Sequence, residues 1–464
     1  MRVMHIALAV VLPILSAAPP RTFRVDYFHT GSATEERFSL DRLVVEPLAW
    51  PGNPARPIDE TNLGKYLFEV RDRGTNRLLY SRGFSSIYGE WETTPEAKET
   101  HRTFHESLRF PSPEGPVQIV LKKRDSKDES FRERWSLMVD PKDIFVDASR
   151  PPSPGSVIAL QNKGNSATKL DLLILGDGYR ASERSKCEKD ARRLMEVLFS
   201  RSPFRERRGD FNLWGLCPAS EESGISRPST GIHHRSAIGA TYDAFGSERY
   251  ILTFDNRAFR DIASFASYDA VEILVNGNTY GGGGIFNLYS TVASDTLWAP
   301  YIFVHELGHH LAGLADEYFT SPSAYESPAG RPEPWEPNVT ALRDPAHPKW
   351  AVFLSPGVPI PTPWQVQEFE TWEAGIQKRR KQIRAERRPE AEMDALFQEE
   401  KAQETKMLGA EKYAGKVGAF EGANYESKGY FRPQTDCVMF SRDDVPFCAV
   451  CQSAINRIID LYTK

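Results

Sequence analysis

The pentapeptide HELGH, from His305 to His309, constrains the structure of this chain more than any other feature. On an α-helix, residues four apart lie one above the other, so the two imidazoles could bind one metal ion. Glu306 lies on the adjacent face, where its carboxylate could activate a metal-bound water. Apolar residues such as Phe303 and Leu311 flank the motif and predict a buried helix. A buried His-Glu-His cluster is costly to desolvate unless it is paired or metallated. The segment therefore favours a Zn²⁺ site, and a helix with purely structural histidines is the less favoured interpretation.

A catalytic zinc usually has three protein ligands and one open position. The spacing HExxHxxGxxH of metzincin peptidases would place the third histidine at position 315, which is Ala315 here. A continuous helix would carry Asp316 about 16 Å along the axis from His305, out of reach of the same metal. Gly313 can adopt a positive φ, end the helix and turn the chain back. Asp316 is therefore the predicted third ligand, and Glu317 is the alternative.

Three further features could complete such a site. Met439 lies downstream of the ligand helix, as does the methionine turn beneath the zinc of metzincins. Tyr430, with Tyr425 as the alternative, could place a phenol over the open side of the metal and stabilise an oxyanion. Four consecutive glycines, residues 281–284, could form a cleft edge to which an extended peptide adds by backbone pairing.

The N-terminus has the layout of a secretory signal peptide. Arg2 precedes an apolar run from Ile6 to Leu15, and small residues follow up to Ala18. The run is too short to anchor the chain across a membrane. Residues 1–18 are therefore a predicted signal peptide, and the mature chain is expected to be secreted or periplasmic.

The five cysteines leave at least one thiol unpaired within the chain, because their number is odd. Cys448 and Cys451 form a CxxC pair with Cys437 nearby. In an exported protein this arrangement favours a structural disulfide. A cysteine-based zinc site is the alternative interpretation, although the sequence has no second CxxC pair.

Hydropathy patterns divide the rest of the chain. Residues 21–148 contain short strand-like runs between Gly/Pro turns and predict a β-sandwich, in which His101 and His105 are not expected to share a metal. Residues 149–166 are proline-rich and predict a linker. Residues 167–464 predict an α/β domain with a mixed sheet, from strands at 169–175, 211–216, 270–275 and 285–293 and a helix at 183–200. A charged segment near 367–407 predicts an inserted pair of surface helices divided at Pro389.

Composition narrows the classes of partner. With 40% hydrophobic and 26% charged residues, the chain is typical of a soluble globular protein. The net charge of −5 gives no reason to expect nucleic acid or an anionic membrane as a partner. No segment after the N-terminal run is long and apolar enough to span a membrane.

Several separated segments together resemble one family, the IgA peptidase M64 family. They are residues 305–318, 333–340, 420–422, 436–439 and 447–451, and residues 85–91 look like that family's N-terminal β domain. The resemblance implies a metzincin-like zinc endopeptidase, with His305 and His309 as ligands and Glu306 as the catalytic acid/base. Immunoglobulin A is not carried over as the substrate, because the resemblance matches catalytic residues and not a substrate-recognition surface.

The expected function is therefore that of a secreted zinc metalloendopeptidase acting on a protein or peptide, which could be a glycoprotein. Glu306 would deprotonate a zinc-activated water and return the proton to the leaving amine. One alternative is a zinc-dependent hydrolase of non-peptide substrates. Another is an exported glycan- or protein-binding protein with a structural zinc site, against which Glu306 argues because a structural site needs no such carboxylate.

Overall fold

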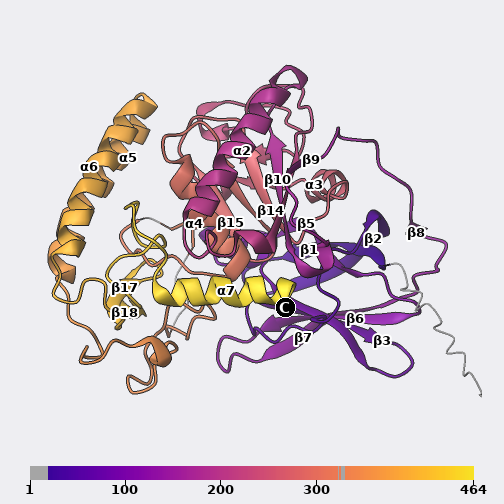
Figure 1. The fold of residues 1–464 in the computed structure, drawn as a ribbon, viewed down its shortest axis with the longest axis horizontal. Coiled ribbons are helices and arrows are strands. Elements are labelled where there is room, and N and C mark those ends of the chain that lie inside the picture. The colour runs from indigo at the N-terminus through magenta and orange to yellow at the C-terminus, as the bar shows by residue number, and fades with distance from the viewer. Residues whose placement is uncertain (1–18, 322, 326–329) are drawn as a thin grey trace, which may run out of the picture.

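Two four-stranded β-sheets form the N-terminal part of the chain (Figure 1). The computed structural model describes residues 19–321, 323–325 and 330–464, so the predicted signal peptide lies outside the described residues. One sheet has the strand order β5-β1-β2-β8, and the other has the order β4-β3-β6-β7. The strand bounds are β1 Arg21–Gly31, β2 Glu36–Ala49, β3 Tyr66–Asp72, β4 Leu78–Phe84, β5 Arg102–Pro111, β6 Val117–Arg124, β7 Phe131–Val139 and β8 Val146–Asp147.

A shared apolar core lies between these two sheets. Phe23, Val25 and Tyr27 alternate along β1 and are completely buried, as the period-two geometry of a strand requires when one face is covered. Phe68 of β3 and Ile119 of β6 belong to the same cluster. The prediction of a β-rich N-terminal region is therefore confirmed.

Two long strands of this part, β2 and β5, have little visible strand pattern in the sequence. Both carry charged residues at exposed or half-buried positions, which masks their hydrophobic alternation. His105 lies in β5, and its ring nitrogen is 3.0 Å from a carboxylate oxygen of Asp41. His101 instead contacts Glu35 at 2.6 Å. The two histidines therefore bond to different carboxylates and do not converge on one site.

A six-stranded mixed sheet forms the centre of the second part, with the order β15-β16-β14-β10-β11-β9. The four central strands are parallel, and β15 and β9 run antiparallel at the two edges. The predicted strand at 285–293 is in fact a hairpin, and β9 lies inside the predicted linker. The strand bounds are β9 Ile158–Gln161, β10 Leu170–Asp177, β11 Phe211–Leu216, β14 Ala270–Val275, β15 Gly282–Ile285 and β16 Tyr289–Ala293.

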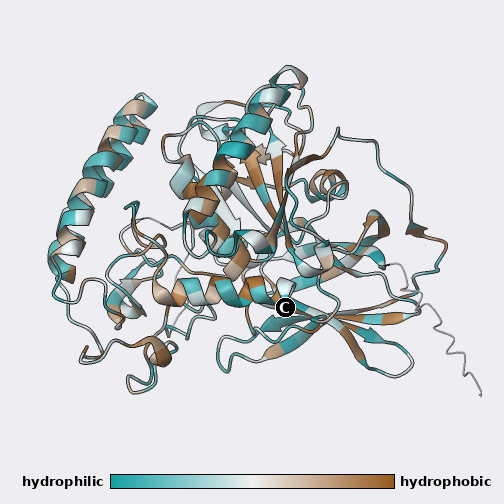
Figure 2. Ribbon diagram, in the orientation of Figure 1, coloured by the Kyte–Doolittle hydropathy of each residue, from teal (hydrophilic) through white to brown (hydrophobic). Residues whose placement is uncertain are grey.

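Helices cover both faces of this sheet. Leu172 and Ile174 of β10 point into a core shared with several helices, whereas Leu173 and Leu175 point into a second core shared with α3. This division explains why β10 is an almost uninterrupted apolar run, drawn brown in Figure 2. The helices are α2 Arg184–Ser200, α4 Ala299–Ala312 and α7 Ala449–Thr463 on the first face, and α3 Asn256–Ala263 on the second.

The charged segment folds into two helices, α5 Val366–Ala385 and α6 Glu390–Gly409, with Pro389 at the N-terminal cap of α6. They pack against each other and lie at one edge of the molecule in Figure 1. Phe369 and Phe397 are buried and join the larger core, so this pair is anchored to the sheet domain rather than fully solvated.

Shorter elements complete the fold. They are β12 Ala240–Thr241 and β13 Leu252–Thr253, which pair with each other, the helix α1 Ile87–Trp91, and the hairpin of β17 Phe420–Ala423 and β18 Glu426–Arg432. Across the described ranges, none of the helices combines the length and the apolar character needed to cross a bilayer.

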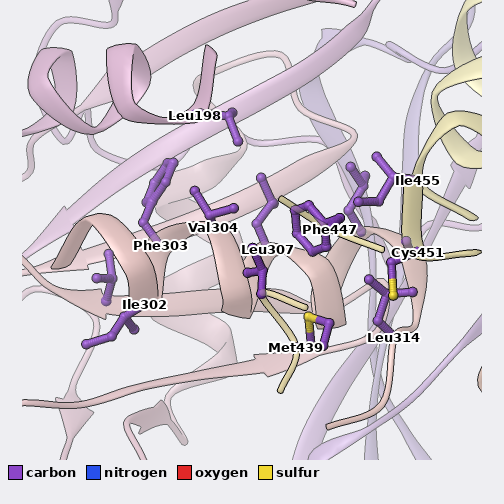
Figure 3. Close-up of a cluster of buried hydrophobic side chains, with 14 of the residues drawn as sticks. Leu198, Ile302, Phe303, Val304, Leu307, Leu314, Met439, Phe447, Cys451 and Ile455 are labelled. Atoms are coloured by element: carbon purple, nitrogen blue, oxygen red, sulfur yellow. The ribbon is translucent and has the colours of Figure 1, made fainter. Parts of the chain in front are cut away.

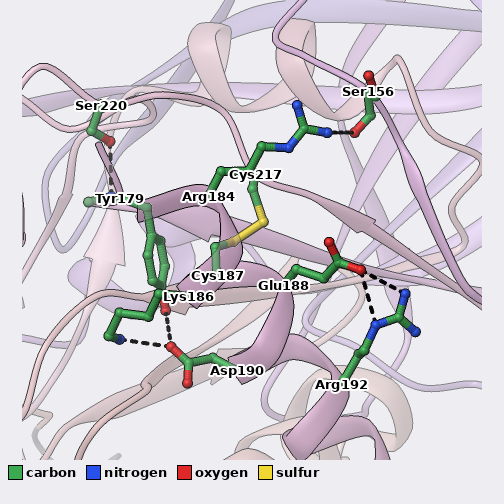
Figure 4. The surroundings of a disulfide bond; sticks show 11 residues. Ser156, Tyr179, Arg184, Lys186, Cys187, Glu188, Asp190, Arg192, Cys217 and Ser220 are labelled. Carbon is green, nitrogen blue, oxygen red and sulfur yellow. Dashed lines mark hydrogen bonds and ion pairs between the residues drawn. A yellow bond between two sulfur atoms is a disulfide. The ribbon is translucent and has the colours of Figure 1, made fainter. Parts of the chain in front are cut away.

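A disulfide joins Cys187 of α2 to Cys217, just after β11 (Figure 4). Both cysteines are buried, and the bond closes a loop with a sequence separation of 30 residues. It fastens the first helix of the sheet domain to a central parallel strand. The bond therefore adds a covalent restraint to a region that apolar packing already holds.

We predict that replacing both Cys187 and Cys217 by serine lowers the free energy of unfolding by about 3–4 kcal/mol, since a 30-residue loop gains that much entropy in the unfolded chain. Urea denaturation monitored by circular dichroism measures the difference. A phosphine reductant should destabilise the wild type by a similar amount and leave the double variant unchanged. Equal effects on both proteins would contradict the prediction.

Candidate metal centre

The helix α4 carries the HELGH segment and lies against the sheet. Ile302, Phe303 and Leu307 are buried in the larger core, which fixes the rotation of the helix about its axis (Figure 3). With that face turned inward, His305 and His309 lie one turn apart and their Nε2 atoms are 3.1 Å from each other. The helical spacing of the motif thus brings both imidazoles to one point.

Gly313 ends α4 in the left-handed conformation, with φ 59° and ψ 37°. Its N–H donates to the carbonyl of His309 at 3.0 Å, and the N–H of Leu314 donates to the carbonyl of Gly308 at 3.3 Å. A side chain at position 313 would also meet the ring of Trp335 at 2.6 Å. Only glycine fits this conformation and this space, and the chain turns back toward the helix as predicted.

This turn brings Asp316 to the two histidines. Its Oδ1 atom lies 3.0 Å from Nε2 of His305 and 3.3 Å from Nε2 of His309. The Nδ1 atoms point away from this meeting point: His305 donates to the carbonyl of Val438 at 2.9 Å, and His309 donates to that of Leu314 at 2.5 Å. Two imidazoles oriented by backbone carbonyls, together with one carboxylate, are the kinds of donor that catalytic zinc sites with an open fourth position use.

The charges of these residues favour a cation. Burial alone would raise the pKa of Asp316, but His309 and His305 outweigh it and hold that pKa well below its usual range. Burial alone would lower the pKa of His309, but Asp316 and Glu306 outweigh it and raise that pKa to about 9. The cluster therefore holds a proton strongly, and a divalent metal ion would take the place of that proton.

Glu306 lies beside this cluster and lines a cavity of about 230 Å³. Burial raises the pKa of its carboxyl, and the nearby His305 and His309 offset part of the rise. Among the described residues, none forms a hydrogen bond with this carboxylate. A carboxylate at the edge of a cavity, beside a candidate metal position, is placed to exchange a proton with a molecule bound there.

Both parts of the chain contribute to the wall of this cavity. Glu90 of α1 faces it from the N-terminal part and accepts hydrogen bonds from the hydroxyls of Tyr250 and Tyr325. Burial raises the pKa of Glu90, although these two hydroxyls lower it. No sequence motif points to Glu90, because its place in the cavity wall depends on packing between segments that are distant in the sequence.

Comparison with known families agrees with this geometry. The profile of the IgA peptidase M64 family matches residues 158–459, well over half of the chain. The chain belongs to the IgA peptidase M64 family. The profile of the peptidase M64 N-terminus matches residues 16–136. Among curated proteins, none matches the chain. Membership of peptidase M64 indicates a peptidase that acts on a peptide or protein.

In this M64 chain the two candidate tyrosines have different positions. Tyr425 lines the cavity, and its hydroxyl donates to Oδ2 of Asp316. The hydroxyl of Tyr430 instead donates to the carbonyl of Pro332 at 3.1 Å, and its ring packs with Val339 away from the cavity lining. The geometry therefore favours Tyr425 over the predicted Tyr430, because the backbone of β18 directs Tyr430 into a separate small core.

Tyr425 reaches the cavity from a strained hairpin turn. Asn424 and Tyr425 form the two-residue loop between β17 and β18 and have φ values of 53° and 64°. Their N–H groups donate to the carbonyls of Asp316 and Tyr318, both at 3.0 Å. These two hydrogen bonds hold the turn against the segment that carries Asp316. Non-glycine residues with positive φ cluster at active sites.

The glycines of β15 allow this edge strand to approach α4. A side chain at position 284 would meet the carbonyl of Glu306 at 2.4 Å and Cβ of His309 at 2.9 Å. However, the backbone of Gly282 already bonds to Arg249 and Ile251, each at 3.1 Å. The strand lines the cavity as predicted, but at Gly282 its outer edge is not free to pair with a peptide.

Met439 and Glu317 lie beneath the motif helix rather than in the cavity. Met439 is completely buried, and a side chain at Gly308 would meet its Sδ atom at 3.1 Å (Figure 3). Glu317 points away from the two histidines, and its Oε1 atom accepts a hydrogen bond from Asn338 at 2.9 Å. Of the two acids considered as third ligand, the structure thus brings Asp316 to the centre.

The third histidine of the helix, His310, has a structural role. Its Nε2 accepts a hydrogen bond from the N–H of Val271 at 3.1 Å, and its Nδ1 donates to the carbonyl of Ile285 at 3.2 Å. Burial lowers the pKa of His310 to about 4, so the ring is neutral. It joins α4 to β14 and β15 and does not contribute to the metal centre.

We predict that Asp316→Asn weakens zinc binding by more than about a hundredfold, because even residues that only orient a ligand cost ten- to a hundredfold. Competition with a chromophoric chelator measures the affinity. Asp295→Asn, at a half-exposed carboxylate outside the centre, is the control and should bind zinc as the wild type does. Unchanged affinity in Asp316→Asn would rule out Asp316 as a ligand.

Proposed function

We propose that this chain is an exported zinc metalloendopeptidase whose zinc is held by His305, His309 and Asp316. The observation that carries the proposal is the convergence of these three side chains, with distances of 3.0–3.3 Å between their ligand atoms, next to Glu306 in a cavity. A zinc ion held there would supply a Lewis acid with an open position for substrate and water.

The carboxylate of Glu306 takes a proton from the attacking water in this proposal. The water oxygen bonds to the scissile carbonyl carbon, and the carbon–nitrogen bond then breaks. Glu306 returns the proton to the leaving amine, so it acts first as base and then as acid. Its raised pKa suits both steps, since a proton that is accepted must also be given back.

Tyr425 is the best-placed donor to the oxyanion that forms during this reaction. Its hydroxyl lines the cavity and reaches the carboxylate of Asp316, so it lies close to the open side of the centre. A phenol aimed at a developing negative charge stabilises the transition state more than the ground state. We assign Tyr425 this role, in addition to its contact with Asp316.

The metzincin-like character of the domain rests on the same residues. A helix with both histidines, a glycine turn, a third ligand beyond it and a buried methionine beneath the helix follow one another in the order found in metzincins. The departure is the third ligand, which is an aspartate one residue further along. Endopeptidase activity is what the family resemblance implies, and the substrate protein is left open.

Two observations support export. The first 18 residues have the composition of a signal peptide. The disulfide between Cys187 and Cys217 is of the kind that forms and persists in oxidising compartments. The proposed location is therefore outside the cytoplasm, either secreted or periplasmic.

We predict that Glu306→Gln abolishes peptide cleavage, with at least a hundredfold loss in kcat, while zinc content is unchanged. The substrate is a peptide library derived from a proteome, and mass spectrometry measures the products. Glu188→Gln, at a part-exposed glutamate of α2 outside the cavity lining, is the matched control. If Glu306→Gln gave the same cleavage products as the wild type, that result would contradict the peptidase mechanism. A wild type that binds zinc and cleaves nothing would favour a binding protein with a structural zinc.

We further predict that Tyr425→Phe lowers kcat by about a hundredfold or more, with KM changed little, as expected for a lost oxyanion donor. Tyr430→Phe should leave both constants within a few fold, because its hydroxyl bonds to Pro332 outside the cavity lining. Steady-state kinetics on one fluorogenic peptide compares the two variants. The reverse ranking would restore Tyr430 as the oxyanion donor.

A further inference from the structure

A second cluster of metal-binding side chains lies beneath α4, outside the cavity. It consists of Cys437, Cys448, Cys451 and Glu317, and their ligand atoms all lie within 4.8 Å of one another. The Sγ atoms of Cys437 and Cys451 are 3.9 Å apart. The Oε1 atom of Glu317 is 3.2 Å from Sγ of Cys451 and 3.9 Å from Sγ of Cys448. None of the three thiols is in a disulfide.

These distances match one tetrahedral metal position. With zinc–sulfur bonds of about 2.3 Å and zinc–oxygen bonds of about 2.1 Å, tetrahedral ligands lie about 3.8 Å apart for two sulfurs and about 3.6 Å apart for sulfur and oxygen. The observed pairs fall on both sides of these values. These three pairs therefore have separations close to those of a tetrahedral set, and the remaining pairs also lie within 4.8 Å.

Burial makes the cluster costly without a cation. Glu317, Cys437 and Cys451 are completely buried, and Cys448 is nearly so. The Oε2 atom of Glu317 has no hydrogen-bond partner among the described residues. A buried carboxylate oxygen without a hydrogen-bond partner loses the free energy of its hydration, and coordination to a metal ion would offset that cost.

The local backbone also favours thiolates at this point. Cys448 caps the N-terminus of α7, and the N–H of Cys451 donates to its sulfur at 3.4 Å. The N–H of Cys448 donates to the sulfur of Cys437 at 3.2 Å. Helix N-termini and N–H donors stabilise the negative thiolate, which is the form that binds metal.

We propose that Cys437, Cys448, Cys451 and Glu317 bind a second zinc ion, which is structural. Thiolate ligands select zinc among the divalent ions that oxygen-rich sites would accept. All four positions are occupied by protein atoms, so the ion has no open position for catalysis. The proposal of this site does not rest on the proposed peptidase activity.

A disulfide explains the cluster less well than a metal does. Three thiols cannot all pair, so one would stay buried and unused next to Glu317. The carboxylate would also gain nothing from a bond between two of the sulfurs. A single cation, in contrast, engages all three sulfurs and the glutamate.

The second ion would hold the first centre in shape. Glu317 directly follows Asp316, and its N–H donates to the carbonyl of Met439 at 2.8 Å. Val438, next to Cys437, accepts the hydrogen bond from Nδ1 of His305. The structural zinc therefore joins the turn that carries the third ligand to the segment that orients the first histidine.

The test is the metal content of the full-length mature chain, purified without chelator and measured by inductively coupled plasma mass spectrometry. We expect two zinc ions per chain in the wild type and one in Cys448→Ser. His309→Ala should also hold one ion, lost from the other centre. The double variant Cys187→Ser with Cys217→Ser removes two cysteines outside the cluster and should retain two ions.

Cobalt substitution of the wild type keeps the test independent of variant folding. Co²⁺ bound by three thiolates gives an intense near-ultraviolet charge-transfer band, which histidine and carboxylate ligands do not give. The band should persist in His309→Ala. A wild type that binds one ion, gives no thiolate band and shows a Cys437–Cys451 or Cys448–Cys451 disulfide by peptide mapping would overturn the proposal. If His309→Ala then bound no zinc, the result would still support the catalytic zinc centre while the second site is rejected.

Discussion

The turn at Gly313 is the constraint on which the site depends. Two histidines on one helix face can be predicted from spacing alone, but a third ligand must come from chain that has left the helix. The left-handed glycine ends α4 within four residues of His309 and returns Asp316 to a point 3.0 Å from His305. The same turn aims Glu317 to the opposite side of the helix, so consecutive acids serve two separate clusters.

Packing around α4 explains why these positions are held. The sheet fixes one face of the helix, His310 joins it to β14 and β15, and Met439 fills the space beneath Gly308. The glycines of β15 let that strand approach the helix backbone. A buried metal centre needs such support on every side, because a displacement of about 1 Å in a ligand or base costs much of the activity.

The sequence could predict those parts of the molecule that depend on local spacing. The helix of His305 and His309, the turn at Gly313 and the aspartate beyond it follow from helical geometry and the properties of glycine. The parallel strands β11 and β14 follow from apolar runs. Tyr425 could not be chosen over Tyr430, since a hairpin turn with positive φ decides which ring faces the cavity. Glu90 and the partnership of Glu317 with three cysteines depend on contacts between segments more than a hundred residues apart.

An anomalous difference map at the zinc absorption edge, from crystals of the chain grown without chelator, tests the central claim most directly. The account predicts a peak about 2.0–2.2 Å from Nε2 of His305, Nε2 of His309 and a carboxylate oxygen of Asp316. A peak held by the two histidines with Asp316 turned away, or no peak beside Glu306, would contradict it.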